Sequence, residues 1–297
     1  MAMRTHASKL IAVLLCGCAQ LAACGADERE EMRGSLFFVV GSYLVQLDLR
    51  DGSTAVVTNV GDAEIQSLSP QLDNRLLLTV YGSENQRDMH RLVLYDIETR
   101  QMLPLLNGRQ GYYLPGTKTL VFDDGVGIYL TERVMGSWER TEVAEHRFNE
   151  RVEIMPISAQ RFAYRVGDGP LVLFDKTVGR SLELAGLDTT CDLERALWFT
   201  AREQMLCKLR RNESEYEYAF VTLDGSVEQT LSLPAGRDFK PVAWVPDQDV
   251  LVLTEQWSTW FTARQRSAVG LSGFATGEAC RCIEDQYLGD TVIYRGN

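Results

Sequence analysis

The feature that most constrains the fold of this chain is a unit that recurs about every 45 residues. In each copy a short apolar strand, often ending in Asp, is followed by a polar turn and a second apolar strand. The clear copies are Val45–Asp48 with Thr54–Val57, Val93–Asp96 with Met102–Leu105, and Val172–Asp175 with Leu182–Leu184. Weaker copies lie at Phe220–Leu233, Gly270–Ile283 and near Ile128–Leu130, where an enlarged turn is expected around Gly136–Trp138.

Two further strands precede that pair in several copies. They are Ile65–Pro70 with Arg75–Tyr81, and Pro241–Pro246 with Val250–Thr254. Four short strands in each period are typical of a propeller blade, which buries its faces only against its neighbours. The first copy lacks its leading strand, and the segment Asp290–Tyr294 can supply it, so that the ring closes without an exposed edge.

The sequence therefore predicts an all-β fold with a single β-propeller over residues 35–297. Six four-stranded blades closed by the C-terminal strand are the leading count; five or seven blades, and a pair of irregular β-sandwiches, are the alternatives. The pattern resembles propeller domains with WD40-like or TolB-like repeats across nearly the whole of this region. No Trp-Asp or Gly-His signature is present, so the resemblance indicates an architecture and not one specific family.

The N-terminus has the three parts of an export signal. Arg4 and Lys9 form a positive region, Leu10–Leu15 is a short apolar core, and small residues follow. Leu21-Ala22-Ala23-Cys24 then resembles the lipobox of bacterial lipoproteins, which implies cleavage before Cys24 and a lipid on its sulfur. A weaker lipobox ending at Cys18, and plain secretion with a cut after Ala23, are the alternatives.

The expected organisation is a signal peptide at 1–23, a lipidated tether at 24–34 and the propeller domain after it. Gly25, rather than Asp, follows the lipid-bearing cysteine, and by resemblance to the sorting rule of enteric bacteria this favours the outer membrane over the inner membrane. The predicted location is the bacterial cell envelope, with the N-terminal lipid as the contact with the membrane.

The charge of the chain argues against nucleic acid as a partner. The formal net charge is −11, and the signal would remove two of the basic residues. A strongly negative domain is repelled by phosphate backbones.

Four cysteines besides Cys24 belong to the predicted domain, namely Cys191, Cys207, Cys280 and Cys282. In an oxidising compartment they favour disulfides, and three pairings are possible. Cys191 with Cys207 is preferred because the two flank one short β segment. A metal site is not predicted, because paired cysteine knuckles are missing and no histidine neighbours these cysteines.

No catalytic residue can be assigned from the sequence. His90 is expected in a polar hairpin loop and His146 near a blade junction, both at the surface, without a nucleophile elbow nearby. The carboxylate groups at Asp123-Asp124-Gly125, Asp168-Gly169 and Asp247-Gln248-Asp249 fit polar turns. No motif for a cofactor is found, and an active site assembled from several blades at the propeller axis would leave no local motif.

The leading functional hypothesis is a non-enzymatic protein-binding or scaffold module in the envelope. The alternatives are a hydrolase or lyase acting on glycans or peptides, and a carbohydrate-binding module. Trp257 and Trp260 are the candidate binding residues, because strand alternation would place them on opposite faces, although both could pack between blades. A scaffold predicts an apolar patch on one rim, a sugar binder an exposed Trp beside polar groups, and an enzyme a converging set of acids or histidines.

Overall fold

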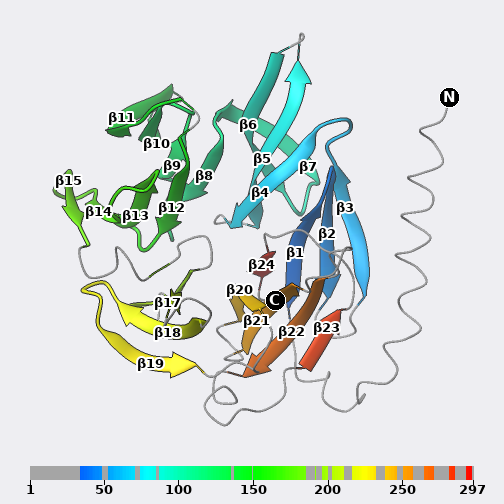
Figure 1. Ribbon diagram of the computed structural model, residues 1–297. Coiled ribbons are helices and arrows are strands. Elements are labelled where there is room, and N and C mark those ends of the chain that lie inside the picture. Colours follow the sequence, from blue (N-terminus) through cyan, green and yellow to red (C-terminus); the bar gives the residue numbers. More distant parts are fainter. Residues whose placement is uncertain are drawn as a thin grey trace.

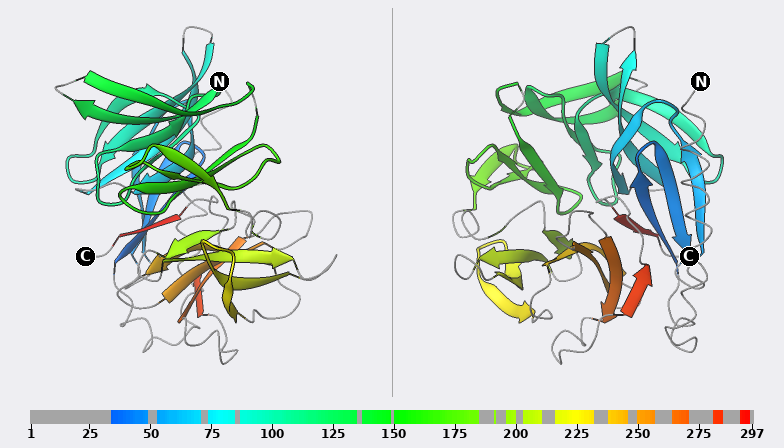
Figure 2. Two further views of the ribbon diagram at one scale, coloured as in Figure 1. Left: turned by 90° about the vertical axis from the view of Figure 1, so that its left-hand side faces the viewer. Right: turned by 45° about the vertical axis from the view of Figure 1, so that its right-hand side comes forward.

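The computed structural model describes residues 34–48, 53–70, 74–84, 87–134, 137–148, 150–184, 191, 196–199, 203–210, 216–231, 238–245, 250–256, 264–270, 281–284 and 292–295. These residues form β-strands and turns, and the strands pair into six four-stranded antiparallel sheets. Figure 1 shows the sheets standing around a common centre, and Figure 2 gives two further views of that arrangement. The prediction of an all-β, single β-propeller is confirmed.

The first three sheets are built from the N-terminal half of the chain. Sheet 1 has the order β24 (Val292–Arg295), β1 (Ser35–Val40), β2 (Tyr43–Asp48) and β3 (Thr54–Asn59). Sheet 2 contains β4 (Glu64–Pro70), β5 (Arg75–Glu84), β6 (Arg87–Asp96) and β7 (Gln101–Asn107). Sheet 3 contains β8 (Gln110–Tyr113), β9 (Leu120–Asp123), β10 (Gly127–Val134) and β11 (Ser137–Glu145).

The next three sheets repeat the same order. Sheet 4 contains β12 (Val152–Pro156), β13 (Arg161–Val166), β14 (Val172–Asp175) and β15 (Arg180–Glu183). Sheet 5 contains β16 (Leu197–Phe199), β17 (Gln204–Arg210), β18 (Tyr216–Thr222) and β19 (Val227–Leu231). Sheet 6, described by its backbone alone, contains β20 (Asp238–Val245), β21 (Val250–Gln256), β22 (Arg264–Gly270) and β23 (Arg281–Glu284).

The first strand of each sheet lies toward the centre. β4 neighbours both β24 and β8, β8 neighbours β12, and β20 neighbours both β16 and β24. β24 is antiparallel to β1 with Phe38 opposite Val292, so the C-terminal strand pairs with the first repeat as predicted. Five of the six sheets carry described side chains.

Apolar clusters between neighbouring sheets form the core. Strand alternation places one apolar face of each sheet against the next sheet, and each fully buried Leu or Phe contributes about 1.5–3 kcal/mol. Each of four clusters combines residues of two adjacent sheets. Their members include Phe37 and Leu78 (sheets 1 and 2), Leu92 and Phe122 (sheets 2 and 3), Val121 and Phe162 (sheets 3 and 4), and Leu173 and Met205 (sheets 4 and 5).

The Asp that ends the third strand in several repeats has a structural role. Asp96 accepts hydrogen bonds from the backbone N–H groups of Glu98 and Thr99 and so closes the turn to β7. The Thr99 N–H and then the Arg75 guanidinium lower the pKa of Asp96 below its ordinary value. Asp175 and Asp224 close the equivalent turns of sheets 4 and 5 in the same way.

Two local expectations are wrong. The third repeat has no enlarged turn around Gly136–Trp138, because the pairing of β10 with β11 continues to Val134 opposite Ser137. The hairpin loop expected to hold His90 is also shorter, because β5 and β6 pair as far as Glu84 opposite Arg87. His90 therefore lies on a strand, opposite Tyr81. Long hairpins of polar residues read as loops in the sequence although the backbone ladder continues through them.

Candidate functional site

The loops of the propeller gather at two ends, since neighbouring strands run antiparallel. The turn between the second and third strands of a sheet and the crossover to the next sheet share one end, here called the crossover end. The turns between the first and second strands and between the third and fourth strands share the other end, here called the hairpin end. One candidate binding feature lies at each end.

A buried His–Asp pair lies at the crossover end of sheet 3. Asp123 ends β9 and His146 follows β11, and the His146 Nε2 atom is 3.0 Å from Asp123 Oδ1. The two side chains are 0% and 3% exposed. The prediction that His146 is a surface residue is therefore wrong, because the crossover to sheet 4 folds the side chain inward over the end of β9.

Both ring nitrogens of His146 are engaged. Nδ1 lies 3.0 Å from the backbone oxygen of Arg147, while Nε2 faces the Asp123 carboxylate. Both partners are oxygen atoms, so each nitrogen of the ring faces an oxygen whichever of the two carries the proton. Such a ring has no free nitrogen for a substrate. This geometry therefore fits a structural hydrogen-bonded link between strands better than an acid–base catalyst.

The turn after Asp123 requires glycine. Gly125 has φ +101°, a conformation that strains any other residue, and its N–H donates to Asp123 Oδ1 at 2.7 Å. A Cβ at this position would lie 3.1 Å from Arg109 Cδ and 3.8 Å from Phe148 Cε2. The bare backbone therefore lets Arg109 and Phe148 pack over the turn.

Arg109 and His90 continue this polar cluster toward sheet 2. The Arg109 N–H donates to the Asp123 backbone oxygen at 2.7 Å, and the Nη1 atom is buried without a hydrogen-bond partner among the described residues. The ring of His90 lies 4.7 Å from that of Tyr81. Burial lowers the pKa of His90, the positive charge of Arg109 lowers it further, and Asp123 acts in the opposite direction.

An apolar patch covers this cluster at the crossover end. Phe148 is 72% exposed and Val126 is 49% exposed, and the Val126 backbone oxygen accepts a hydrogen bond from the His146 N–H. The Phe148 patch is defined here as Phe148, Val126 and the aliphatic stem of Arg109. An exposed aromatic side chain on a backbone that is held by hydrogen bonds is typical of a residue that anchors a protein partner.

This patch is not among the features predicted from the sequence. Phe148 lies in the polar stretch Glu145-His146-Arg147-Phe148-Asn149-Glu150, where no strand periodicity would bury an aromatic residue. An isolated Phe in a polar connection is the signal that would have revealed it.

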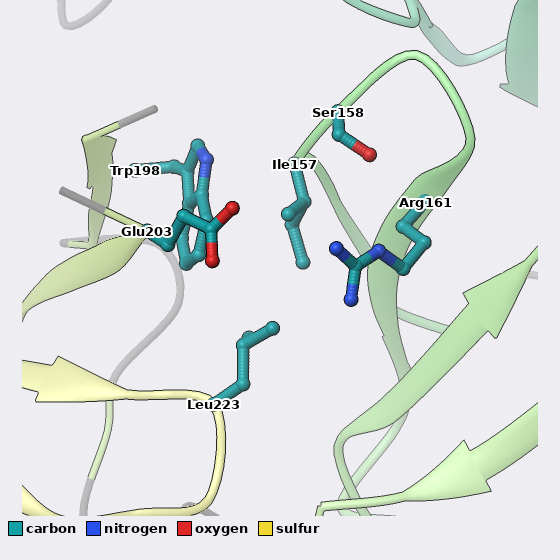
Figure 3. A pocket seen from close by; sticks show the side chains of 6 residues that line it. All are labelled: Ile157, Ser158, Arg161, Trp198, Glu203 and Leu223. Carbon is teal, nitrogen blue, oxygen red and sulfur yellow. The ribbon is translucent and has the colours of Figure 1, made fainter. Parts of the chain in front are cut away.

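A small pocket lies at the hairpin end, between sheets 4 and 5. Figure 3 shows the guanidinium of Arg161 and the carboxylate of Glu203 reaching toward each other from opposite sides, with Ile157 between them. Ser158, Trp198 and Leu223 complete the lining, and the cavity volume is about 40 Å³. Trp198 Nε1 is buried without a hydrogen-bond partner among the described residues. Trp198 is not among the site residues predicted from the sequence, because a tryptophan on a strand near the propeller centre is expected to be buried.

The predicted disulfide between Cys191 and Cys207 is confirmed. The two residues are bonded, 16 positions apart in the chain, and both lie within the apolar cluster shared by sheets 4 and 5. Cys280 lies outside the described residues, and Cys282 is on β23, whose side chains are not described. Trp257, Trp260 and Cys24 also lie outside the described residues, so their predicted roles stay predictions.

The carboxylate pair at Asp123 and Asp124 takes two different roles. Asp124 accepts from the N–H groups of Val126 and Gly127, as the turn prediction expected, and its other oxygen meets Arg140 at 2.9 Å. The Arg140 guanidinium also lies 4.2 Å above the centre of the Tyr129 ring. Within the described ranges no group of three or more His, Cys, Asp or Glu residues is placed to hold a metal ion. The same ranges contain no helix long and apolar enough to cross a membrane.

The fold has counterparts among solved structures. No protein-family model matches the sequence, and no curated protein matches it. TolB from Acinetobacter baumannii is similar, with a TM-score of 0.63 and 15% identity over 88% of this chain and 66% of that one. This chain therefore spans slightly less than two thirds of that protein.

Two further structures share the architecture. A putative TolB from Agrobacterium tumefaciens gives a TM-score of 0.58 with 14% identity over 90% of this chain and all (100%) of that chain. An oligogalacturonate lyase from Vibrio parahaemolyticus gives 0.50 with 15% identity over 77% of this chain and 72% of that one. At such identities the likeness shows the propeller fold alone, since one fold serves many activities.

Proposed function

We propose that this chain is a membrane-anchored lipoprotein of the bacterial envelope whose propeller binds a protein partner through the Phe148 patch and catalyses no reaction. The observation that carries the proposal is the 72% exposure of Phe148 beside the Gly125 turn, which follows Asp123 of the buried His146–Asp123 pair. A protein partner that buries this ring would gain free energy from the buried apolar area. The entropy lost on ordering the surface would be small, because hydrogen bonds already hold the backbone beneath the ring.

The ring itself is proposed to have six blades. The six four-stranded sheets and the neighbours of their central strands support this count. The pairing of β24 with β1 would close the ring, as closure by the C-terminal strand requires.

The anchor is proposed from the sequence, with the signal at 1–23, Cys24 as the lipid-bearing residue and 24–34 as the tether. The first described strand begins at Ser35, where the tether was expected to end. The outer membrane is the proposed destination. The likeness to TolB proteins gives the envelope setting a structural parallel but carries no residue of the anchor.

The anchor has a direct test. Cys24→Ala is expected to abolish incorporation of radiolabelled palmitate and to move the protein from the detergent phase to the aqueous phase in Triton X-114 partition, since each buried methylene contributes about 0.8 kcal/mol to membrane binding. Cys18→Ala is the matched control and should leave both unchanged. Lipid labelling that persists in Cys24→Ala and disappears in Cys18→Ala would assign the anchor to the other cysteine.

The binding surface is tested by capture from native envelopes. Phe148→Ser in the full-length anchored protein is expected to weaken the recovery of its partner about 30-fold, since a central aromatic anchor is worth about 2 kcal/mol or more. Val178→Ser is the control, because Val178 is 63% exposed but lies in the turn between β14 and β15 at the hairpin end. Equal recovery from both variants would exclude the Phe148 patch as the binding surface.

The alternative is a hydrolase or lyase acting on glycans or peptides. The His146–Asp123 pair is the described arrangement closest to acid–base machinery, but its ring is 0% exposed and engaged at both nitrogens. An enzyme would therefore have to use other residues near the axis. A carbohydrate-binding module built on Trp257 or Trp260 is the third proposal, and its residues lie outside the described part of the chain.

A further inference from the structure

The pocket at the hairpin end is lined by two charged side chains that form no described ion pair with each other, and by aliphatic side chains. It also contains one N–H donor without a described hydrogen-bond partner. Arg161 begins β13 and Glu203 immediately precedes β17, and no ion pair joins these two side chains in the described structure although Figure 3 shows them facing each other. Arg161 also pairs in register with Asp175, whose charge balances part of its own. The Trp198 Nε1–H, buried without a described partner, needs an acceptor to recover its desolvation cost.

The ligand that satisfies these groups must offer an acceptor and a donor side by side. Arg161 and Trp198 Nε1 both donate, while the Glu203 carboxylate accepts. A peptide backbone presents C=O and N–H groups in this alternation, so its carbonyls can receive the donors while an N–H meets Glu203. The requirement is chemical and does not depend on the sequence of the ligand.

The apolar part of the lining favours a peptide over a sugar. Ile157 and Leu223 are aliphatic and would leave the hydroxyl groups of a sugar ring that face them without hydrogen-bond partners. An apolar side chain of a peptide has no such groups. The cavity volume of about 40 Å³ is that of a small site, so the apolar occupant is taken to be one short side chain, such as that of Ala or Val.

We propose that this pocket binds an extended peptide segment of another protein, with one short apolar side chain between Ile157 and Leu223 and the adjoining amide bridging Arg161 and Glu203. The site lies at the hairpin end, whereas the Phe148 patch lies at the crossover end. The propeller therefore has two separate contact sites, and this proposal goes beyond the proposed function without relying on the Phe148 patch.

Fluorine NMR of the full-length protein labelled with 5-fluorotryptophan tests the site directly. The chain has five tryptophans, and Trp198→Phe identifies the Trp198 signal by its loss. The peptide probe is N-acetyl-L-valine methylamide and the sugar probe is methyl β-D-glucopyranoside, both at millimolar concentrations. The Trp198 signal is expected to shift in a saturable way with the valine amide and to stay in place with the glucoside.

Two variants and one control define the site further. Leu223→Phe should fill the pocket and abolish the shift, while Leu182→Phe, at an exposed position of β15, should leave it intact. Arg161→Ala should lower the affinity for the valine amide about tenfold without changing the fold, since it removes one charged hydrogen bond. Its circular dichroism spectrum checks that the protein remains folded.

The outcomes separate this proposal from the proposed function. A Trp198 signal that moves with the glucoside alone would replace the peptide by a carbohydrate, and a signal that moves with neither probe would show that the pocket is a packing gap. Either result overturns the peptide site and leaves the capture experiment at Phe148 untouched. Conversely, a shift of the Trp198 signal with the valine amide would support the peptide site even where Phe148→Ser has no effect on partner recovery.

Discussion

Asp123→Ala is expected to lower the free energy of unfolding by about 1–3 kcal/mol, because it leaves the buried His146 Nε2 atom without its hydrogen-bond partner. The side chain of His146 is 0% exposed, so its Nε2 atom has no contact with bulk water to take the place of the lost carboxylate. The same change also removes the acceptor of the Gly125 N–H at 2.7 Å. Denaturant unfolding of the full-length protein measures the difference.

Asp124→Ala is the matched control for this substitution. Asp124 is the next residue and also meets a basic side chain, but it is 22% exposed and its partner Arg140 is 48% exposed. Pairs of this kind contribute about 1 kcal/mol or less. A loss for Asp123→Ala no larger than that of Asp124→Ala would show that the buried pair does not hold the crossover end.

Loss of the Cys191–Cys207 disulfide is expected to destabilise the protein by about 3 kcal/mol, because the bond closes a loop of roughly 15 residues in the unfolded chain. The double variant Cys191→Ala with Cys207→Ala should melt roughly 6–12 °C below the unchanged protein. The bond lies in the apolar cluster between sheets 4 and 5, so the same change loosens the wall of the pocket.

Reduction provides the control for the disulfide. Dithiothreitol should lower the melting temperature of the unchanged protein by a similar amount and leave the double variant unaffected. A double variant that melts with the unchanged protein would mean that the apolar packing of Cys191 and Cys207 alone supports this junction.

The fold could be predicted because its determinants are local and repeated. Alternating apolar residues mark the strands, and an Asp such as Asp96 or Asp175 marks the turn that follows because its carboxylate caps the backbone there. Pairing of the last strand with the first repeat followed from a missing strand at one end and a surplus strand at the other.

The site could not be predicted in the same way, because it depends on contacts between segments distant in sequence. The His146 side chain contacts Asp123, 23 positions earlier in the chain, and no local sequence pattern indicates this contact. The pocket at the hairpin end similarly joins turns of two sheets. The Cys191–Cys207 bond was accessible to prediction because one short β segment separates its ends.

Photocrosslinking from position 148 in intact envelopes tests directly whether the Phe148 patch binds a protein partner. The photoreactive amino acid p-benzoylphenylalanine replaces Phe148 in the full-length anchored protein, and the same residue at Val178 serves as the control. We expect a discrete crosslinked protein from position 148 that is absent from position 178. Identical products from both positions, or none from position 148, would contradict a partner-binding surface at the Phe148 patch.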